Sequence, residues 1–160
     1  ISINNKENNI FLYPSPLSNK PNTFSIFKET NIIEGGSMSA FGIDFGHDGK
    51  RIHSINKTNV FGTTIDELVN NNKFEIPDYI KIDVDGIEHL ILKGGLTILK
   101  NPKNLEIQIE INENYEEQFI AVIKIMNECN FKLKEKKRND LSKYYLDEKF
   151  SKIYNYYFKK

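Results

Sequence analysis

The chain reads Ile80-Lys81-Ile82-Asp83-Val84-Asp85-Gly86-Ile87-Glu88 in the stretch that decides its fold. Side chains alternate along a strand with a period of two, so its β-branched residues share one face and Lys81, Asp83 and Asp85 share the other. The glycine ends this strand, and apolar residues at helical spacing follow in residues 87–93. A strand, an acidic turn and a helix are typical of an open α/β fold, in which ligands bind beyond the carboxyl ends of parallel strands.

Lys81 needs an explanation, because a central strand of a parallel sheet is covered on both faces and is usually apolar throughout. A buried ammonium group is unfavourable unless it is paired, and Asp83 is the nearest partner on the same face. Two interpretations are open. In the first, the two residues form a structural ion pair on a half-exposed strand. In the second, Asp83 and Asp85 lie at the mouth of a crevice, where Lys81 neutralises them.

The composition indicates one globular domain without a nucleic-acid footprint. The 160 residues are 39% hydrophobic and 28% charged, which is ordinary for a chain of this length with a buried core. Basic and acidic residues number 22 each, so the net charge is zero, whereas nucleic-acid binding would need a basic excess. No apolar run is long enough for a membrane span.

The single cysteine, Cys129, excludes an internal disulfide and favours a reducing compartment, so we expect a cytoplasmic protein. Its place on an apolar helical face predicts a core residue. The sequence starts at Ile1 without an initiator methionine or signal-peptide anatomy, which indicates the interior of a longer chain.

Alternation and turn residues predict an antiparallel excursion of hairpins before the central strand. The expected elements are a buried strand over residues 9–13, a proline turn over 14–19, a strand over 23–27, another over 38–45, a turn over 46–49 and an extended segment over 52–56.

Helix signals flank the central strand. Thr64 and Glu67 form a capping-box pattern, which predicts a short helix that ends near Asn70. The helix after the central strand is expected to end with left-handed geometry at the pair Gly94-Gly95, and another helical turn is expected over residues 96–99.

Residues 105–111 alternate between large aliphatic and polar side chains, which predicts a strand. A right-handed crossover places this strand parallel to the central strand, and Lys81 would then face Gln108 or Glu110. The remaining expected elements are an amphipathic helix over residues 116–130 and two closing strands over 131–133 and 153–158.

No glycine-rich phosphate loop follows a strand and opens a helix in this sequence. Asp83, Asp85, Glu88 and His89 carry groups that suit magnesium. However, Glu88 and His89 are consecutive on a helix and diverge by about 100°, so we do not expect a metal site. The two histidines of the predicted hairpins are interpreted as surface or hairpin residues.

Two stretches resemble the FkbM-like methyltransferases. They are Phe61-Gly-Thr-Thr-Ile-Asp-Glu-Leu68 and Pro77-Asp-Tyr-Ile-Lys-Ile-Asp-Val-Asp-Gly-Ile-Glu-His-Leu-Ile-Leu-Lys-Gly94. The family usually has a glutamate where this chain has Asp85, a shorter carboxylate of equal charge. Ser15-Pro-Leu-Ser-Asn19 resembles a segment that follows an earlier strand of the family, and Tyr154-Asn-Tyr-Tyr-Phe158 resembles its last strand.

The resemblance implies a Rossmann-like α/β methyltransferase that uses S-adenosylmethionine and methylates a hydroxyl of a sugar, glycan or other small metabolite. It implies a mostly parallel sheet in the order 3-2-1-4-5-7-6, with antiparallel closing strands. The family's first two strands, with the glycine loop and the ribose-binding acid, precede the part that matches Ser15. We therefore expect residues 1–160 to be one partial domain, with a strand and the hairpin excursion in 1–60 and the central and C-terminal α/β part in 61–160.

The same resemblance implies roles for individual residues. The implied cofactor-binding residues are Ser15, Pro16, Leu17, Asp83 and Val84, and the implied catalytic residues are Asp83, Asp85 and Glu88. The first three would line the adenine side, whereas Asp83 and Val84 would lie beside the methionine part of the cofactor. Asp85 and Glu88 would contact the acceptor or act as its general base, while alignment of an already activated donor supplies much of the catalysis.

The missing first strand would leave one edge of the central strand unpaired. An open apolar edge invites association, so we expect poor stability and negligible methyl transfer from these residues alone. Two other functions stay open. One is a non-catalytic α/β module that binds a partner through its sheet edge, and the other is a metal-dependent hydrolase that uses Asp83, Asp85 and Glu110.

Overall fold

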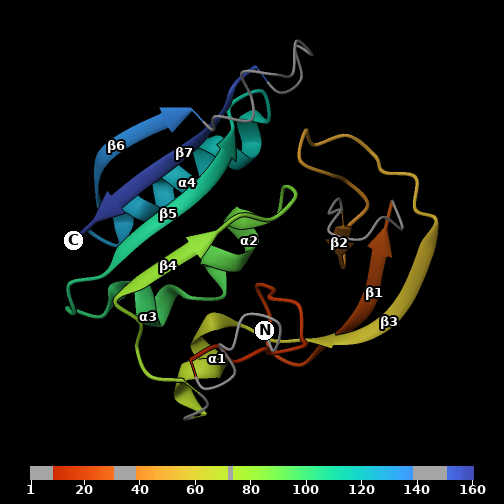
Figure 1. The fold of residues 1–160 in the computed structure, drawn as a ribbon, viewed down its shortest axis with the longest axis horizontal. Helices are drawn as coiled ribbons and strands as arrows, with labels where there is room; N and C mark the ends of the chain where they lie inside the picture. The colour runs from red at the N-terminus through yellow and green to blue at the C-terminus, as the bar shows by residue number, and fades with distance from the viewer. Residues whose placement is uncertain (1–8, 31–38, 72–73, 139–150) are drawn as a thin grey trace.

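The computed structural model describes residues 9–30, 39–71, 74–138 and 151–160. Its strands are β1 (Thr23–Glu29), β2 (Ser39–Phe41), β3 (Asn56–Gly62), β4 (Tyr79–Ile82), β5 (Glu106–Asn112), β6 (Lys132–Arg138) and β7 (Ile153–Lys159). Its helices are α1 (Ile65–Asn70), α2 (Glu88–Lys93), α3 (Leu96–Lys100) and α4 (Glu116–Glu128). The protein is α/β, and the described strands form two sheets (Figure 1).

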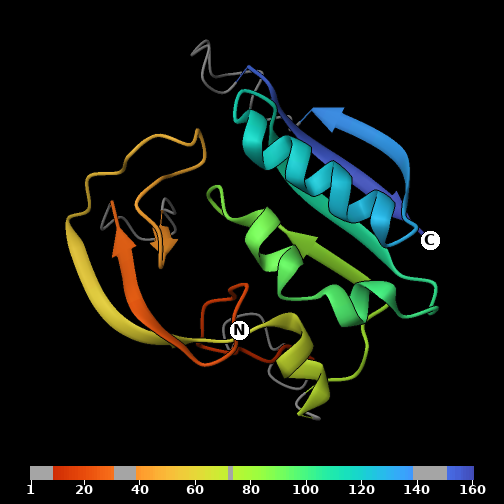
Figure 2. The same cartoon turned by 180° about the vertical axis from the view of Figure 1, so that it is seen from behind.

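The four-stranded sheet has the order β4-β5-β7-β6 and is mixed. The predicted parallel pairing of β4 with β5 is confirmed, as are the two closing strands. A mostly parallel sheet is not what the described residues form, because β7 runs antiparallel to both of its neighbours. Figure 2 shows α2 and α4 against one face of this sheet, and the described residues place no helix on the opposite face.

The three-stranded sheet is the predicted antiparallel excursion, with the order β2-β1-β3. It lies beside the four-stranded sheet, in orange and yellow in Figures 1 and 2. Its strands differ from the predicted bounds, since β2 covers three residues and β3 begins only at Asn56. The glycine turn, residues 46–49, is confirmed by a hydrogen bond of 2.9 Å from Gly49 N to Gly46 O.

The predicted buried strand over residues 9–13 is wrong. Ile10, Phe11 and Leu12 are 48%, 79% and 81% exposed. No described strand pairs with this segment. A strand needs a neighbour that takes up its backbone hydrogen bonds, so the apolar run alone does not make one.

Helix α1 begins and ends as predicted. The Thr64 hydroxyl accepts a hydrogen bond from the backbone N–H of Glu67 at 3.0 Å. The Glu67 carboxylate in turn accepts from the Thr63 hydroxyl at 2.6 Å and from the Asn22 amide at 3.0 Å. The capping residues therefore also fix the start of α1 to the segments that precede it.

The predicted left-handed end of α2 is wrong, although the helix ends where expected. Gly94 has φ −78° and Gly95 has φ −118°. Close approach is the physical reason for the glycines instead. A Cβ on Gly94 would lie 2.1 Å from the carbonyl oxygen of Ser18, and one on Gly95 would lie 3.1 Å from Ile65. Helix α3 then follows directly, as predicted.

The core lies between the four-stranded sheet and helices α2, α3 and α4. Leu92, Ile109, Val122 and Met126 are fully buried within it. Cys129 is also fully buried and free, which confirms its predicted place in the core. No described helix is both long and apolar enough to cross a membrane.

Candidate functional site

The acidic turn, residues 83–85, follows the carboxyl end of β4. The strand ends at Ile82 and not at the glycine as predicted, so Asp83 and Asp85 lie beyond the strand and not on its charged face. Gly86 ends the turn with φ 107°, a conformation that glycine adopts without strain. A Cβ at this position would lie 2.5 Å from the carbonyl oxygen of Gly46 and 3.0 Å from the Cα of His47. The acidic turn therefore packs backbone to backbone against the glycine turn, which lies between β2 and β3 in the region of the three-stranded sheet.

Lys81 and Asp83 form an ion pair of 2.6 Å, with side chains 53% and 39% exposed. The pair is therefore half-exposed, and because both residues also line a cavity, both interpretations of the charged face stay open. The exposure arises because this face of the sheet carries none of the described helices (Figures 1 and 2). Lys81 also lies opposite Gln108 in the parallel register, one of its two predicted neighbours. The hydrogen bond to Asp83 raises the pKa of Lys81, so the ammonium group stays charged.

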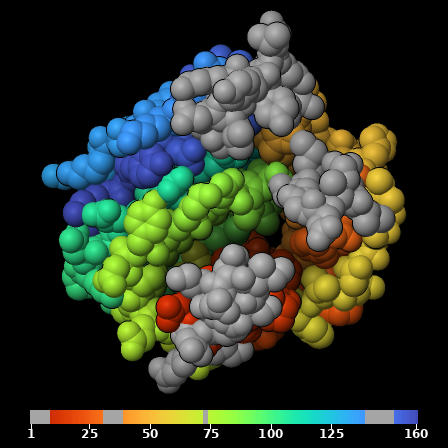
Figure 3. All heavy atoms as spheres, viewed as in Figure 1, coloured from red at the N-terminus to blue at the C-terminus, as the bar shows by residue number. Residues whose placement is uncertain are grey.

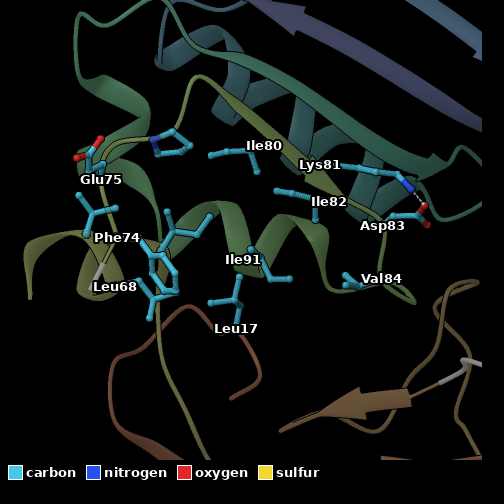
Figure 4. A pocket seen from close by; sticks show the side chains of 13 residues that line it. Leu17, Leu68, Phe74, Glu75, Ile80, Lys81, Ile82, Asp83, Val84 and Ile91 are labelled. Carbon is cyan, nitrogen blue, oxygen red and sulfur yellow. Dashed lines mark ion pairs between the residues drawn. The ribbon is translucent and has the colours of Figure 1, made fainter. Parts of the chain in front are cut away.

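An apolar cavity of about 490 Å³ runs along the edge of β4 that faces away from β5. Figure 4 shows Asp83 and Val84 toward one end of this β4-edge cavity and Glu75 at the other. Its lining consists of Leu17, Ile65, Leu68, Val69, Phe74, Glu75, Pro77, Ile80, Lys81, Ile82, Asp83, Val84 and Ile91.

A second hollow, of about 360 Å³, adjoins the acidic turn at Asp85 and lies against the three-stranded sheet. The lining of this Asp85 hollow consists of Thr30, Ser39, Gly46, His47, Asp48, Lys50, Arg51, Ile52, His53 and Asp85. The Asp85 carboxylate accepts a hydrogen bond of 3.1 Å from the backbone N–H of Ser39, at the start of β2. Consecutive residues, Val84 and Asp85, thus line two different hollows. Figure 3 shows the green residues, which include β4, across the middle of this face and the three-stranded region (yellow and orange) beside them.

Glu88 lies inside the protein, 2% exposed, and lines neither hollow. Burial raises its pKa to about 8, against the opposing effect of backbone hydrogen bonds. The backbone N–H of Gly86 approaches one carboxyl oxygen at 3.5 Å, and the Gln118 amide donates to the other. The Glu88 carboxyl group is therefore mostly protonated at neutral pH. Its contact with Gly86 supports the end of the acidic turn from the protein interior.

The contacts of Glu88 continue to the glycine turn. Asn112 donates its backbone N–H to the Gln118 side-chain oxygen at 3.3 Å and its side-chain amide to the His47 carbonyl at 3.1 Å. This mostly buried chain joins α2, α4, the end of β5 and the glycine turn. Glu88 therefore helps to hold the two regions together.

His89, next to Glu88, is also buried. Burial lowers its pKa, and its Nδ1 has no hydrogen-bond partner among the described residues. The rings of His89 and Tyr115 form a T-shaped pair with centroids 6.2 Å apart, and those of Tyr115 and Phe45 form another with centroids 5.8 Å apart. This aromatic seam packs beside the glycine turn, because a Cβ on Gly49 would lie 2.8 Å from the Tyr115 ring.

The structure brings three of the predicted cofactor residues together, since Leu17, Asp83 and Val84 share the β4-edge cavity. Leu17 is held there because its neighbours Pro16 and Ser18 exchange backbone hydrogen bonds of 3.0 and 2.8 Å with Thr63.

The remaining predicted site residues lie apart from this group. Ser15 and Pro16 are half-buried and do not line the cavity. Asp85 lines the neighbouring hollow. Within the described ranges, no three His, Cys, Asp or Glu side chains are grouped as a metal site would require. The set proposed for a hydrolase, which adds Glu110 to the acidic turn, is therefore not assembled.

Two residues of the buried chain, Gln118 and Asn112, were not singled out by the sequence analysis. Gln118 lies four residues before Val122 on the buried stripe of α4, so a polar residue on an apolar stripe was the available signal. Asn112 ends the alternating strand β5, and nothing in its local pattern marks it.

The family model described as the methyltransferase FkbM domain matches residues 1–133 of the chain. No curated protein and no solved structure matches this chain. The matched range contains the acidic turn and all the residues that line the two hollows.

Proposed function

We propose that this chain transfers a methyl group from S-adenosylmethionine to a hydroxyl of a sugar or other small metabolite. The chain belongs to the FkbM methyltransferase family and is a methyltransferase; the donor and the acceptor are the proposal. We further propose that it acts in the cytoplasm, since its free, buried cysteine suits a reducing compartment.

The observation that carries the proposal is the division of the acidic turn between two hollows. Asp83 and Val84 line the β4-edge cavity, and Asp85 lines the other hollow. Both hollows reach the acidic turn that follows the carboxyl end of β4, the end at which open α/β sheets bind their ligands. A donor in the first and an acceptor in the second would meet across this turn.

The β4-edge cavity fits one side of the cofactor. Leu17 supplies an apolar side chain of the kind on which an adenine ring packs, and Asp83 supplies a carboxylate for a positively charged donor. When bound, S-adenosylmethionine supplies a methyl group on a positively charged sulfur, already activated for transfer. Ser15 and Pro16, which precede Leu17, are proposed to extend the adenine side.

Asp85 is the proposed general base. It accepts the proton that the acceptor hydroxyl loses as the new oxygen–carbon bond forms and the sulfur–carbon bond breaks. A positioned base of this kind contributes about 10²–10⁴-fold to the rate. Glu88 is buried and mostly protonated, so we assign it to positioning: it holds the acidic turn in place.

The described strands also support the proposed Rossmann-like sheet. Their order, β4-β5-β7-β6, matches the last four strands of the order implied for the family. Among them, β4 pairs only with β5, which leaves its other edge for a further parallel strand. Such a strand would lie beside residues 80–82 and leave the end of the β4-edge cavity at Asp83 and Val84 for the cofactor. We propose that residues 1–160 form one partial domain and that this strand and its glycine loop come from preceding sequence.

The proposal is tested with the product of the complete reading frame, by calorimetric titration with S-adenosylmethionine and by a methyl-transfer assay. Asp85→Asn is expected to lower kcat by about 10²–10⁴-fold with cofactor affinity unchanged. Asp83→Asn is expected to weaken cofactor binding by roughly tenfold, because a charge-assisted contact is lost. Lys124→Gln, at an exposed position of α4, is the control.

Full turnover by both aspartate variants would contradict the proposed roles. Micromolar binding of S-adenosylmethionine by residues 1–160 alone would contradict the proposal that cofactor binding needs a further strand and its glycine loop.

A further inference from the structure

The Asp85 hollow has a rim of defined shape. Residues 44–52 form part of this rim, and this rim segment pairs with itself through two backbone hydrogen bonds. They run from Ile52 N to Asp44 O at 2.9 Å and from Gly46 N to Lys50 O at 3.0 Å. Arg51 lies on this segment, where its backbone forms an isolated bridge with Phe45. The Arg51 side chain is thus presented to the hollow by a fixed backbone.

The basic groups of the rim differ in what they contact. Lys50 pairs with Asp48 at 3.8 Å, and Asp48 also accepts the backbone N–H of Lys50 at 3.1 Å. The guanidinium of Arg51 makes no ion pair and no side-chain hydrogen bond with the described part of the chain. An exposed arginine that lines a hollow and has no partner among the described residues is available to a ligand.

We propose that the acceptor bound in the Asp85 hollow carries an oxyanion, a phosphate or a carboxylate, which Arg51 binds while Asp85 receives the hydroxyl to be methylated. This inference rests on the proposed function. Arginine presents a planar fork of donors that matches two oxygens of a carboxylate or phosphate. Asp85 and Arg51 come from different segments of the same hollow, so they contact different parts of one small polyhydroxylated molecule.

Direct binding tests the inference without requiring turnover. Calorimetric titrations of the complete protein use glucose, glucose 6-phosphate, glucuronate and inorganic phosphate as probes at one ionic strength. At least one of the two anionic sugars is expected to bind roughly tenfold more tightly than glucose, and which one it is identifies the oxyanion. Arg51→Gln is expected to remove this preference and to leave glucose binding unchanged. Lys57→Gln, an exposed lysine of β3 outside the hollow, is the matched control.

Three results would overturn the inference: equal binding of charged and neutral sugars, no effect of Arg51→Gln, or no binding of any sugar. Inorganic phosphate that binds as well as glucose 6-phosphate would also overturn it, because the site would then recognise an anion and not an acceptor. Failure of the proposed function is separate, since it shows as absent binding of S-adenosylmethionine. An anion preference that depends on Arg51 supports the inference when S-adenosylmethionine also binds; without cofactor binding it would leave Arg51 as an anion site and overturn its role toward a methyl acceptor.

Discussion

The two sheets of this protein differ in how they are covered. In the four-stranded sheet, alternate residues of β5 are buried under the helices, and Ile107, Ile109 and Ile111 are at most 1% exposed. In the three-stranded sheet, β3 is exposed along most of its length, and Phe24 and Phe61 pack on each other at 4.7 Å while remaining 59% and 63% exposed. The four-stranded region therefore supplies most of the stability of the fold. The three-stranded region supplies walls for the site at the junction between the two sheets.

Core truncation should separate the two regions most clearly. Leu92→Ala empties a fully buried position in α2 and is expected to lower the free energy of unfolding by about 2–5 kcal/mol. Phe61→Ala removes a larger side chain from the three-stranded sheet, yet it is expected to lower the free energy by less than about 1 kcal/mol because the ring is already largely in water. Urea unfolding measures both. Equal losses would show that the three-stranded sheet belongs to the same core and would break the comparison.

The junction itself is tested at Gly86. Gly86→Ala places a Cβ 2.5 Å from the Gly46 carbonyl at a positive φ, so it is expected to lower the free energy of unfolding by about 2–3 kcal/mol. Gly42→Ala is the matched control: it also has a positive φ, 70°, but its Cβ meets only the Ser25 side chain, at 3.4 Å. It is expected to lower the free energy by about 1 kcal/mol. Equal effects in urea unfolding would mean that the regions are not in tight contact there.

The buried carboxyl of Glu88 predicts a dependence on pH. Its pKa is about 8 in the folded protein against an ordinary value of 4.5. Between these values the folded state keeps a proton that the unfolded state has released. The stabilising contribution is therefore complete below pH 4.5 and is lost as the pH rises to 8, with a slope of at most about 1.4 kcal/mol per pH unit.

Glu88→Gln stays neutral and can still accept the amide of Gln118, so its stability relative to the unmodified protein is expected to increase with pH. Urea unfolding at several pH values between 5 and 8 measures this difference. His89 acts in the opposite direction, because burial lowers its pKa and favours protonation of the unfolded state. Both proteins carry His89, so its contribution cancels. Parallel stability profiles would mean that Glu88 titrates normally and does not brace the junction as proposed.

The sequence predicts the four-stranded region well because local patterns decide it. The alternation in residues 105–111, the apolar spacing after Gly86 and the cap at Thr64 each correspond to an element with nearly the expected bounds. In these elements, period and capping agree with what the packing requires, so local reasoning is sufficient.

Local patterns fail where distant contacts decide. Residues 9–13 are as apolar as a strand, but none of the described strands pairs with them. Gly94 is a glycine because Ser18 approaches it from far away in the sequence, and a helix-end rule cannot anticipate that contact. The same holds for the candidate site. The acidic turn is evident from the sequence, whereas its division between two hollows depends on how the three-stranded sheet packs against it.

The smallest expected effect concerns the ion pair between Lys81 and Asp83, which is part of both interpretations of the charged residues on and after β4. A double-mutant cycle with Lys81→Gln and Asp83→Asn, followed by urea unfolding, is expected to give a coupling of at most about 0.5 kcal/mol, because both side chains are substantially exposed. A coupling this weak would mean that the fold does not depend on the charge of Asp83, which then remains available to a positively charged ligand. A coupling above about 1.5 kcal/mol would instead make the pair part of the framework of the sheet, well beyond what exposed pairs contribute. Loss of cofactor binding in Asp83→Asn would then be an effect of the altered strand, and the assignment of Asp83 to the β4-edge cavity would lose its main support.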